Sequence, residues 1–159
     1  MRKNEPFDEL PWQYFPKPKI GHYPPAFIYG FPLGDGVSGI EHLARATGIL
    51  KPEEVLTPRG LDSILARTLK HLEEECGLLR EEFLSVDGCY SKAASYVLML
   101  KTSYNLGHVA PKKLEHVIKV IRRYLPGRTP QWFLDPDIID MGRRNFEIPG
   151  LLFCRLPWR

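Results

Sequence analysis

Residues 87–104 read DGCYSKAASYVLMLKTSY and contain the densest apolar run of the chain. Asp87 is a good helix N-cap, and Gly107 beyond the stretch is a good helix stop. On a helical wheel the apolar side chains fall on nearly every side, namely Ala93, Ala94, Val97, Leu98, Leu100 and Tyr104. A helix that is apolar all round belongs inside a core. We therefore expect a central buried helix here.

Three further segments predict amphipathic helices around this one. Residues 38–48 begin with the spacing of a capping box and end at a glycine. Residues 57–77 begin with a Thr-Pro pair, repeat leucines along one face and also end at a glycine. Residues 111–125 follow a proline, carry one apolar face and end before Pro-Gly. The regular part of the chain is thus expected to contain about four helices.

The 15 prolines lie mostly outside this predicted helical centre. None falls between Pro58 and Pro111, whereas seven lie between Pro6 and Pro32 among many aromatic residues. Because proline interrupts regular structure, both ends of the chain are expected to be extended. The predicted fold is mainly α, a single domain with Pro- and aromatic-rich arms. Its parts are an N-terminal arm over 1–34, a helical domain over 35–128, and short helical turns with an extended tail over 129–159.

Composition indicates a soluble globular protein. The chain has 159 residues, of which 43% are apolar and 26% charged, as is usual for one folded domain. Its three cysteines are widely spaced and include no CxxC pair, which favours free thiols in a reducing compartment, the cytoplasm or an organelle matrix. No apolar run approaches the roughly 20 residues that span a bilayer. We expect no signal segment and no membrane span.

Positive charge is concentrated in one block. The net charge is only +3, but residues 88–128 hold eight Lys or Arg and a single acid. Helical spacing puts Lys112, His116, Lys119 and Arg123 on one stripe opposite the apolar face of 111–125, which suits an anionic partner. The predicted contact residues are Lys112, Lys113, His116, Lys119, Arg122, Arg123 and Arg128. The alternatives are a solvated helix face and contact with the acidic residues 73–75 or 81–82 of the same chain.

The arms supply a second candidate surface. Aromatic residues lie beside Lys or Arg at both ends of the chain, in the composition that interface anchors favour. The predicted partner anchors are Trp12, Tyr14, Phe15 and Trp158. Packing of both arms on their own domain is the alternative.

Signals for cofactor, metal or catalytic chemistry are weaker. Residues 34–39 match GxGxxG, but no second strand ending in an acid follows at the spacing of a dinucleotide fold. Asp135, Asp137 and Asp140 could suit Mg²⁺ or Ca²⁺, yet turn and N-cap aspartates look the same. The histidines show no zinc spacing. We expect neither cofactor nor metal.

Three functions follow from these signals. The first is a non-catalytic accessory or structural subunit that docks into a larger assembly, such as a ribonucleoprotein or organellar complex, through its arms and basic helix. Its partners would be proteins, with RNA or another polyanion as the alternative ligand of the helix. The second is a stand-alone nucleic-acid-binding protein. The third is a small enzyme with a site near Asp87, Tyr90 and His108, which could supply an acid and a proton relay.

Overall fold

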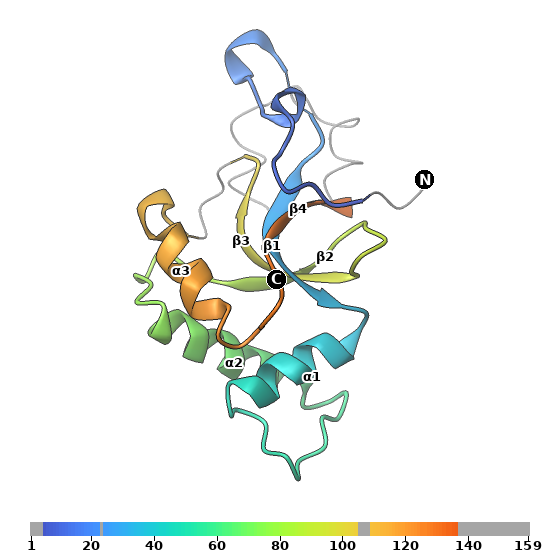
Figure 1. The fold of residues 1–159 in the computed structure, drawn as a ribbon, viewed down its shortest axis with the longest axis vertical. Coiled ribbons are helices and arrows are strands. Elements are labelled where there is room, and N and C mark those ends of the chain that lie inside the picture. The colour runs from blue at the N-terminus through green and yellow to red at the C-terminus, as the bar shows by residue number, and fades with distance from the viewer. Residues whose placement is uncertain (1–4, 23, 105–108, 137–159) are drawn as a thin grey trace.

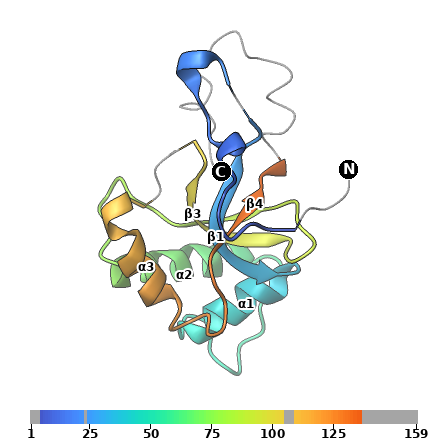
Figure 2. The ribbon, with the colours of Figure 1, turned by 45° about the horizontal axis from the view of Figure 1, so that its top comes forward.

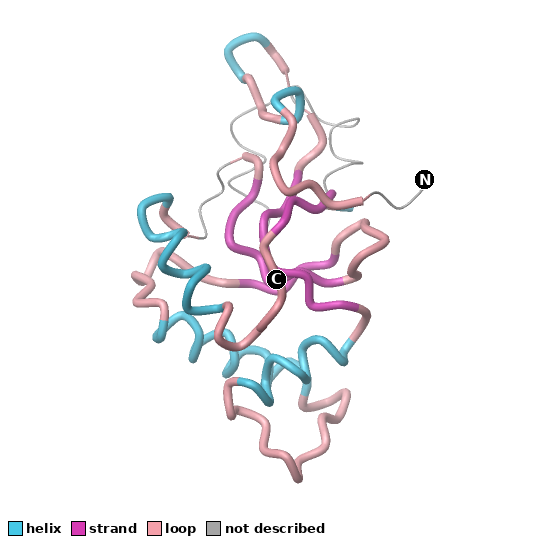
Figure 3. Tube along the Cα trace, viewed as in Figure 1, coloured by secondary structure: helices cyan, strands magenta, loops and turns pink. Residues whose placement is uncertain are grey.

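The structure is a computed structural model that describes residues 5–22, 24–104 and 109–136. Within these residues four strands form one antiparallel sheet in the order β2-β3-β1-β4 (Figures 1 and 3). The strands are β1 (Phe27–Gly34), β2 (Ser85–Gly88), β3 (Tyr96–Thr102) and β4 (Gln131–Leu134). The helices are α1 (Val37–Ala46), α2 (Leu61–Glu75) and α3 (Leu114–Ile121). Short 3-10 helices occur at η1 (Trp12–Tyr14), η2 (Pro18–Ile20) and η3 (Pro111–Lys113).

The prediction of a mainly helical domain is wrong, because the sheet and the helices together make a mixed α/β fold. The predicted central helix is instead the β2–β3 segment. In β3, Leu98 and Leu100 face the helices, whereas Val97 and Met99 face the opposite side, and all four are buried. Both faces of the strand are covered, so its sequence is apolar at consecutive positions. Periodicity alone cannot separate such a strand from a buried helix.

Strands also replace irregular structure at both ends of the predicted helical domain. Residues 27–34, expected to belong to the N-terminal arm, form β1 and pair with both β3 and β4. Residues 131–134, expected to form a short helical turn, are β4 at the edge of the sheet. β3 and β4 are each antiparallel to β1, so they run parallel to each other on either side of it. The chain passes from one to the other through α3.

Helices lie in three of the four segments predicted to be helical. Each is followed by a glycine with positive φ, at Gly48 (φ 74°), Gly77 (φ 62°) and Gly127 (φ 75°), as expected of C-terminal stops. Figures 1 and 2 show all three helices on the same side of the sheet. The main core fills the space between them, with Phe31, Leu72, Leu98, Val117 and Ile121 among its fully buried members.

The N-terminal segment packs against its own sheet rather than standing free. Phe7 pairs with Trp132 of β4 through two backbone hydrogen bonds, of 3.0 and 2.7 Å. Leu10 and Tyr14 join Phe27 and Trp132 in a mainly aromatic cluster. The 3-10 helices η1 and η2 lie at the end of the molecule away from α1 and α2 (Figure 1). Part of the predicted arm is therefore a structural element of the domain.

Candidate functional site

The basic stripe predicted from the sequence lies along η3, α3 and the turn after it. Val117, Val120 and Ile121 bury one side of α3 in the core. The other side carries exposed cationic or titratable side chains, and we call these five the basic face: Lys112, His116, Lys119, Arg122 and Arg123. In the described part of the chain the ion pairs join Arg45 to Glu41, Lys70 to Glu74, Lys92 to Glu5 and Lys113 to Glu82. None of them neutralises the basic face.

Two of the predicted contact residues have internal roles instead. The Lys113 ammonium lies 2.6 Å from a carboxylate oxygen of Glu82 and also donates to the Gly77 carbonyl at 3.1 Å. Arg128 donates to the Pro32 carbonyl at 2.6 Å and so attaches the end of the α3 segment to β1. The alternative of contact with the chain's own acidic residues thus applies to Lys113. Lys113 and Arg128 are therefore not counted among the side chains that could contact a partner.

Glu82 forms a clasp between the segment after α2 and the start of η3. Its side chain is only 8% exposed and accepts the backbone N–H of Leu79 at 2.8 Å and that of Ala110 at 3.1 Å, besides the Lys113 ammonium. The Leu79 hydrogen bond and then the Lys113 contact lower the pKa of Glu82 to about 2. The carboxylate stays charged at neutral pH and orients the first turn of the basic segment.

The acidic residues of α2 are likewise bound to groups other than the basic face. Glu75 accepts the Tyr124 hydroxyl at 2.7 Å, and this hydrogen bond raises the pKa of Tyr124. Glu73 accepts the backbone N–H of Leu84 at 2.8 Å. His71 stands edge-on to the Tyr124 ring, with centroids 6.2 Å apart. The α2 contacts therefore hold α3 in place and leave its outer side positively charged.

A cluster that the sequence did not predict lies on the helix-covered face of the sheet. Tyr29 is paired with Lys101 of β3 and with Trp132 of β4, so the three side chains stand side by side. The Lys101 ammonium is 5.3 Å from the centroid of each ring, within cation–π range. We call these three residues the aromatic–lysine cluster. Only the register of three strands distant in sequence brings it together.

The electrostatics of this cluster are those of a partly buried cation. Burial lowers the pKa of Lys101, and none of the ion pairs among the described residues includes it. Burial also raises the pKa of Tyr29, and the charge of Arg122 acts against that rise. The Arg122 guanidinium is thus close enough to affect the Tyr29 hydroxyl. The cluster and the basic face share one electrostatic environment.

The predicted aromatic anchors divide between core and surface. Tyr14 is half-buried, with its ring 4.8 Å from that of Phe27. Trp12 is 72% exposed and Phe15 43% exposed. The Lys17 ammonium lies 4.4 Å from the centroid of the Trp12 ring. The fourth anchor, Trp158, lies outside the described residues.

The proposed catalytic group lies only partly within the described residues. Asp87 accepts the Ser85 hydroxyl at 2.7 Å on β2, at one edge of the sheet. Tyr90 packs against the mainly aromatic cluster near β4, where its backbone N–H bonds to the Leu134 carbonyl. His71 faces Tyr124 in the helical layer, and His108 lies outside the described residues. The catalytic hypothesis therefore stays a prediction.

The glycine-rich segment after β1 shapes a close contact between strand and helix. A Cβ atom on Gly39 would lie 1.8 Å from the Leu33 carbonyl oxygen, so only glycine lets α1 pack against β1 here. Ser38 donates to the Asp35 carbonyl at 2.8 Å and does not cap the helix. The sheet is antiparallel within the described residues, whereas a dinucleotide fold requires a parallel one.

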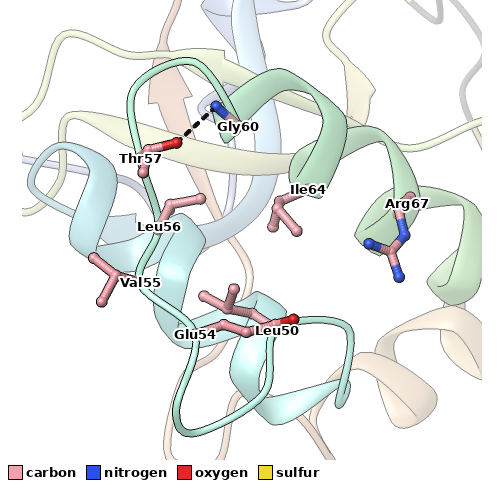
Figure 4. Close-up of a pocket in the computed structure, with 8 residues that line it drawn as sticks. All are labelled: Leu50, Glu54, Val55, Leu56, Thr57, Gly60, Ile64 and Arg67. Carbon is pink, nitrogen blue, oxygen red and sulfur yellow. Dashed lines mark hydrogen bonds between the residues drawn. The ribbon is translucent and has the colours of Figure 1, made fainter.

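A depression of about 310 Å³ lies at the other end of the molecule, between the α1–α2 loop and α2 (Figure 4). Its lining is partly apolar and carries one acid and one base: Leu50, Glu54, Val55, Leu56, Thr57, Gly60, Ile64 and Arg67. Glu54 accepts the backbone N–H of Lys51, and Thr57 accepts that of Gly60. These two hydrogen bonds shape the loop.

The described residues form neither a metal-ligand cluster nor a membrane-spanning helix. Among residues 5–22, 24–104 and 109–136, no three His, Cys, Asp or Glu side chains come together as metal ligands would. Of the proposed aspartates, Asp135 is buried beside β4, and Asp137 and Asp140 lie outside these ranges. Within them, no helix has the length and apolar character needed to cross a bilayer.

Comparison with known proteins adds no family assignment. No protein-family model, curated protein or solved structure matches the chain. The proposed function is therefore based on the geometry of the basic face and its surroundings.

Proposed function

We propose that this chain is a non-catalytic nucleic-acid-binding protein whose contact surface is the basic face of η3 and α3. The single observation that supports it most is the absence, within the described residues, of any ion pair to Lys112, His116, Lys119, Arg122 or Arg123. Exposed like charges on one helix face repel one another. A phosphate backbone relieves that repulsion and adds the entropy of released counterions.

The fixed orientation of α3 also supports a binding role. Glu82, Glu75 and the Pro32 carbonyl hold the segment at its start, its end and the turn beyond. The chain thus satisfies Lys113 and Arg128 internally while it leaves the outward cations together. A backbone segment that is already held in place loses less conformational entropy on binding than a mobile one.

Docking into a larger assembly through the arms stays a prediction. Phe7, Leu10 and Tyr14 pack on the protein's own sheet, so this part of the arm's apolar surface is not open to a partner. Exposed Trp12 and Ile20, the latter 76% exposed, remain for such a contact. Nucleic-acid binding takes precedence because the basic face is the larger group of unneutralised side chains.

Charge reversal on the basic face tests the proposal. The triple variant K112E/K119E/R123E should weaken binding to a fluorescein-labelled 20-nucleotide RNA at least tenfold at about 100 mM KCl. For a single strand, loss of three phosphate contacts should reduce the slope of log K against log salt by about 2. Fluorescence anisotropy over a KCl series measures both quantities.

The matched control changes the same charge elsewhere. R59E/R67E/R80E reverses three exposed arginines on α2 and its flanking loops and should alter the affinity much less than the basic-face variant. Equal losses in the two triple variants would show that only net charge matters. Binding of poly-glutamate as tight as that of RNA would contradict a nucleic-acid ligand and favour an acidic protein surface.

A further inference from the structure

The basic face continues into a line of aromatic and cationic side chains that reaches the N-terminal segment. Arg122 acts electrostatically on Tyr29, which belongs to the aromatic–lysine cluster. Trp132 of that cluster contacts Phe15 with ring centroids 6.5 Å apart, in an edge-to-face arrangement. The Phe15 backbone N–H bonds to the Trp12 carbonyl at 3.3 Å. The groups that follow one another from α3 across the sheet to η1, which we call the aromatic line, are thus Arg122, the aromatic–lysine cluster, Phe15 and Trp12.

The aromatic end of this line is held in position. Tyr14 donates its N–H to the Pro11 carbonyl at 2.9 Å, which closes the turn that carries Trp12. Lys17 and His22 pair through their backbones, and the His22 imidazole lies 2.7 Å from the Gln13 carbonyl oxygen. Trp12 nevertheless stays 72% exposed, although the Lys17 ammonium lies 4.4 Å from the centroid of its ring. An exposed ring on a fixed backbone is a preorganised stacking surface.

Lys101 stands midway along the line and is suited to a single phosphate. Its ammonium lies 5.3 Å from the centroids of both the Tyr29 and Trp132 rings, and among the described residues no carboxylate forms an ion pair with it. Partial burial strengthens the attraction between this charge and an anion that reaches it. Aromatic rings beside a cation are the composition of surfaces that bind single strands, where bases stack and phosphates pair with lysine or arginine.

We propose that the ligand is single-stranded nucleic acid, with bases stacked on Trp12 and Phe15, a phosphate at Lys101 and the following phosphates along the basic face. This inference rests on the proposed function and narrows its substrate class. An unpaired base offers a flat apolar surface to Trp12, whereas a duplex hides its base faces within the stack. The exposed rings therefore favour single-stranded over double-stranded nucleic acid, whereas a basic helix alone would not discriminate between them.

Truncation of the exposed ring tests the inference. W12A should lower the affinity for a 12-nucleotide single strand about tenfold, while the salt slope stays that of the wild type, because a stacked base contributes no counterion release. Affinity for a hairpin duplex of the same length should not change. K101A should instead weaken single-strand binding and reduce the salt slope by about 0.7. Fluorescence anisotropy with labelled oligonucleotides measures all three.

Controls separate the inference from the proposed function and from misfolding. Y96A removes an aromatic ring that is 37% exposed at the other end of β3 from Lys101, and it should leave single-strand binding unchanged. W12A should keep the wild-type thermal unfolding midpoint. Equal affinity for single strand and duplex, with no effect of W12A, would overturn the inference while the basic face remained a nucleic-acid site. Failure of the wild type to bind either form would overturn the proposed function itself.

Discussion

Glu82 shows, at the scale of a single residue, how this fold satisfies a buried charge. Three donors converge on its carboxylate, two from the backbone and one from Lys113. Hydrogen bonds to an ionised carboxylate are stronger than neutral ones and favour the charged form. The residue therefore stabilises the folded state through its charge and also fixes the start of η3.

Removal of that charge should destabilise the protein in a pH-dependent way. E82Q keeps the shape of the side chain and should lower the free energy of unfolding by about 2 kcal/mol at pH 7. The folded pKa of about 2 lies below the ordinary value of 4.5, so the carboxylate's contribution is complete above pH 4.5. It is lost as the pH falls from there through about 2.

Urea unfolding of the wild type and E82Q at several pH values checks this prediction. The difference between the two proteins should be constant from pH 7 to pH 5 and should shrink towards zero near pH 2. E41Q is a control, since Glu41 pairs with Arg45 on α1, where both side chains are about one-third exposed. E41Q should lower the free energy of unfolding by less than E82Q does, because partly exposed ion pairs contribute little. A difference between wild type and E82Q that persists unchanged at pH 2 would contradict the assigned role.

At the scale of the element, β3 decides the fold and is also where sequence reasoning went wrong. Leu98 and Met99 are adjacent and fully buried, yet they belong to cores on opposite faces of the sheet. In a strand covered on one face, apolar and polar side chains alternate. This strand is covered on both faces, so its sequence does not show the two-residue period of a strand. The α helices were easier to find, because each has one apolar face and a glycine stop.

The two-sided burial of β3 predicts similar losses on both faces. L98A and M99A should each lower the free energy of unfolding by about 2–5 kcal/mol, since each leaves a cavity in a closed core. Y96A on the same strand should cost less, because its ring is partly exposed. Urea denaturation measures these differences. A cost below about 1 kcal/mol for either core variant would show that one face of the sheet is open.

The candidate site was predictable only in part, for reasons that also belong to the element scale. Four basic residues share one face of a helix at fixed spacing, and so Lys112, His116, Lys119 and Arg123 could be grouped from the sequence alone. That Lys113 and Arg128 turn inward depends on tertiary partners, Glu82 and Pro32. Tyr29, Lys101 and Trp132 meet through strand pairing across about a hundred residues, which no local pattern records.

At the scale of the whole molecule, the depression and the N-terminal segment lie at opposite ends. The α1–α2 loop with its depression lies at one end, and the N-terminal 3-10 helices lie at the other (Figure 1). The aromatic line joins η1 to α3. A single-stranded nucleic acid bound along this line would contact the N-terminal segment, the sheet and α3. It would not reach the depression in Figure 4.

Mapping the bound oligonucleotide by NMR tests the central claim most directly. On titration of the ¹⁵N-labelled protein with a 12-nucleotide single strand, we expect saturable shifts in the backbone amides of 112–123 and in the indole N–H of Trp12. The amides around Lys101 should shift with them, while those of residues 50–67 should stay in place. Shifts centred on residues 50–67, or no saturable shifts at all, would contradict a nucleic-acid site on the basic face.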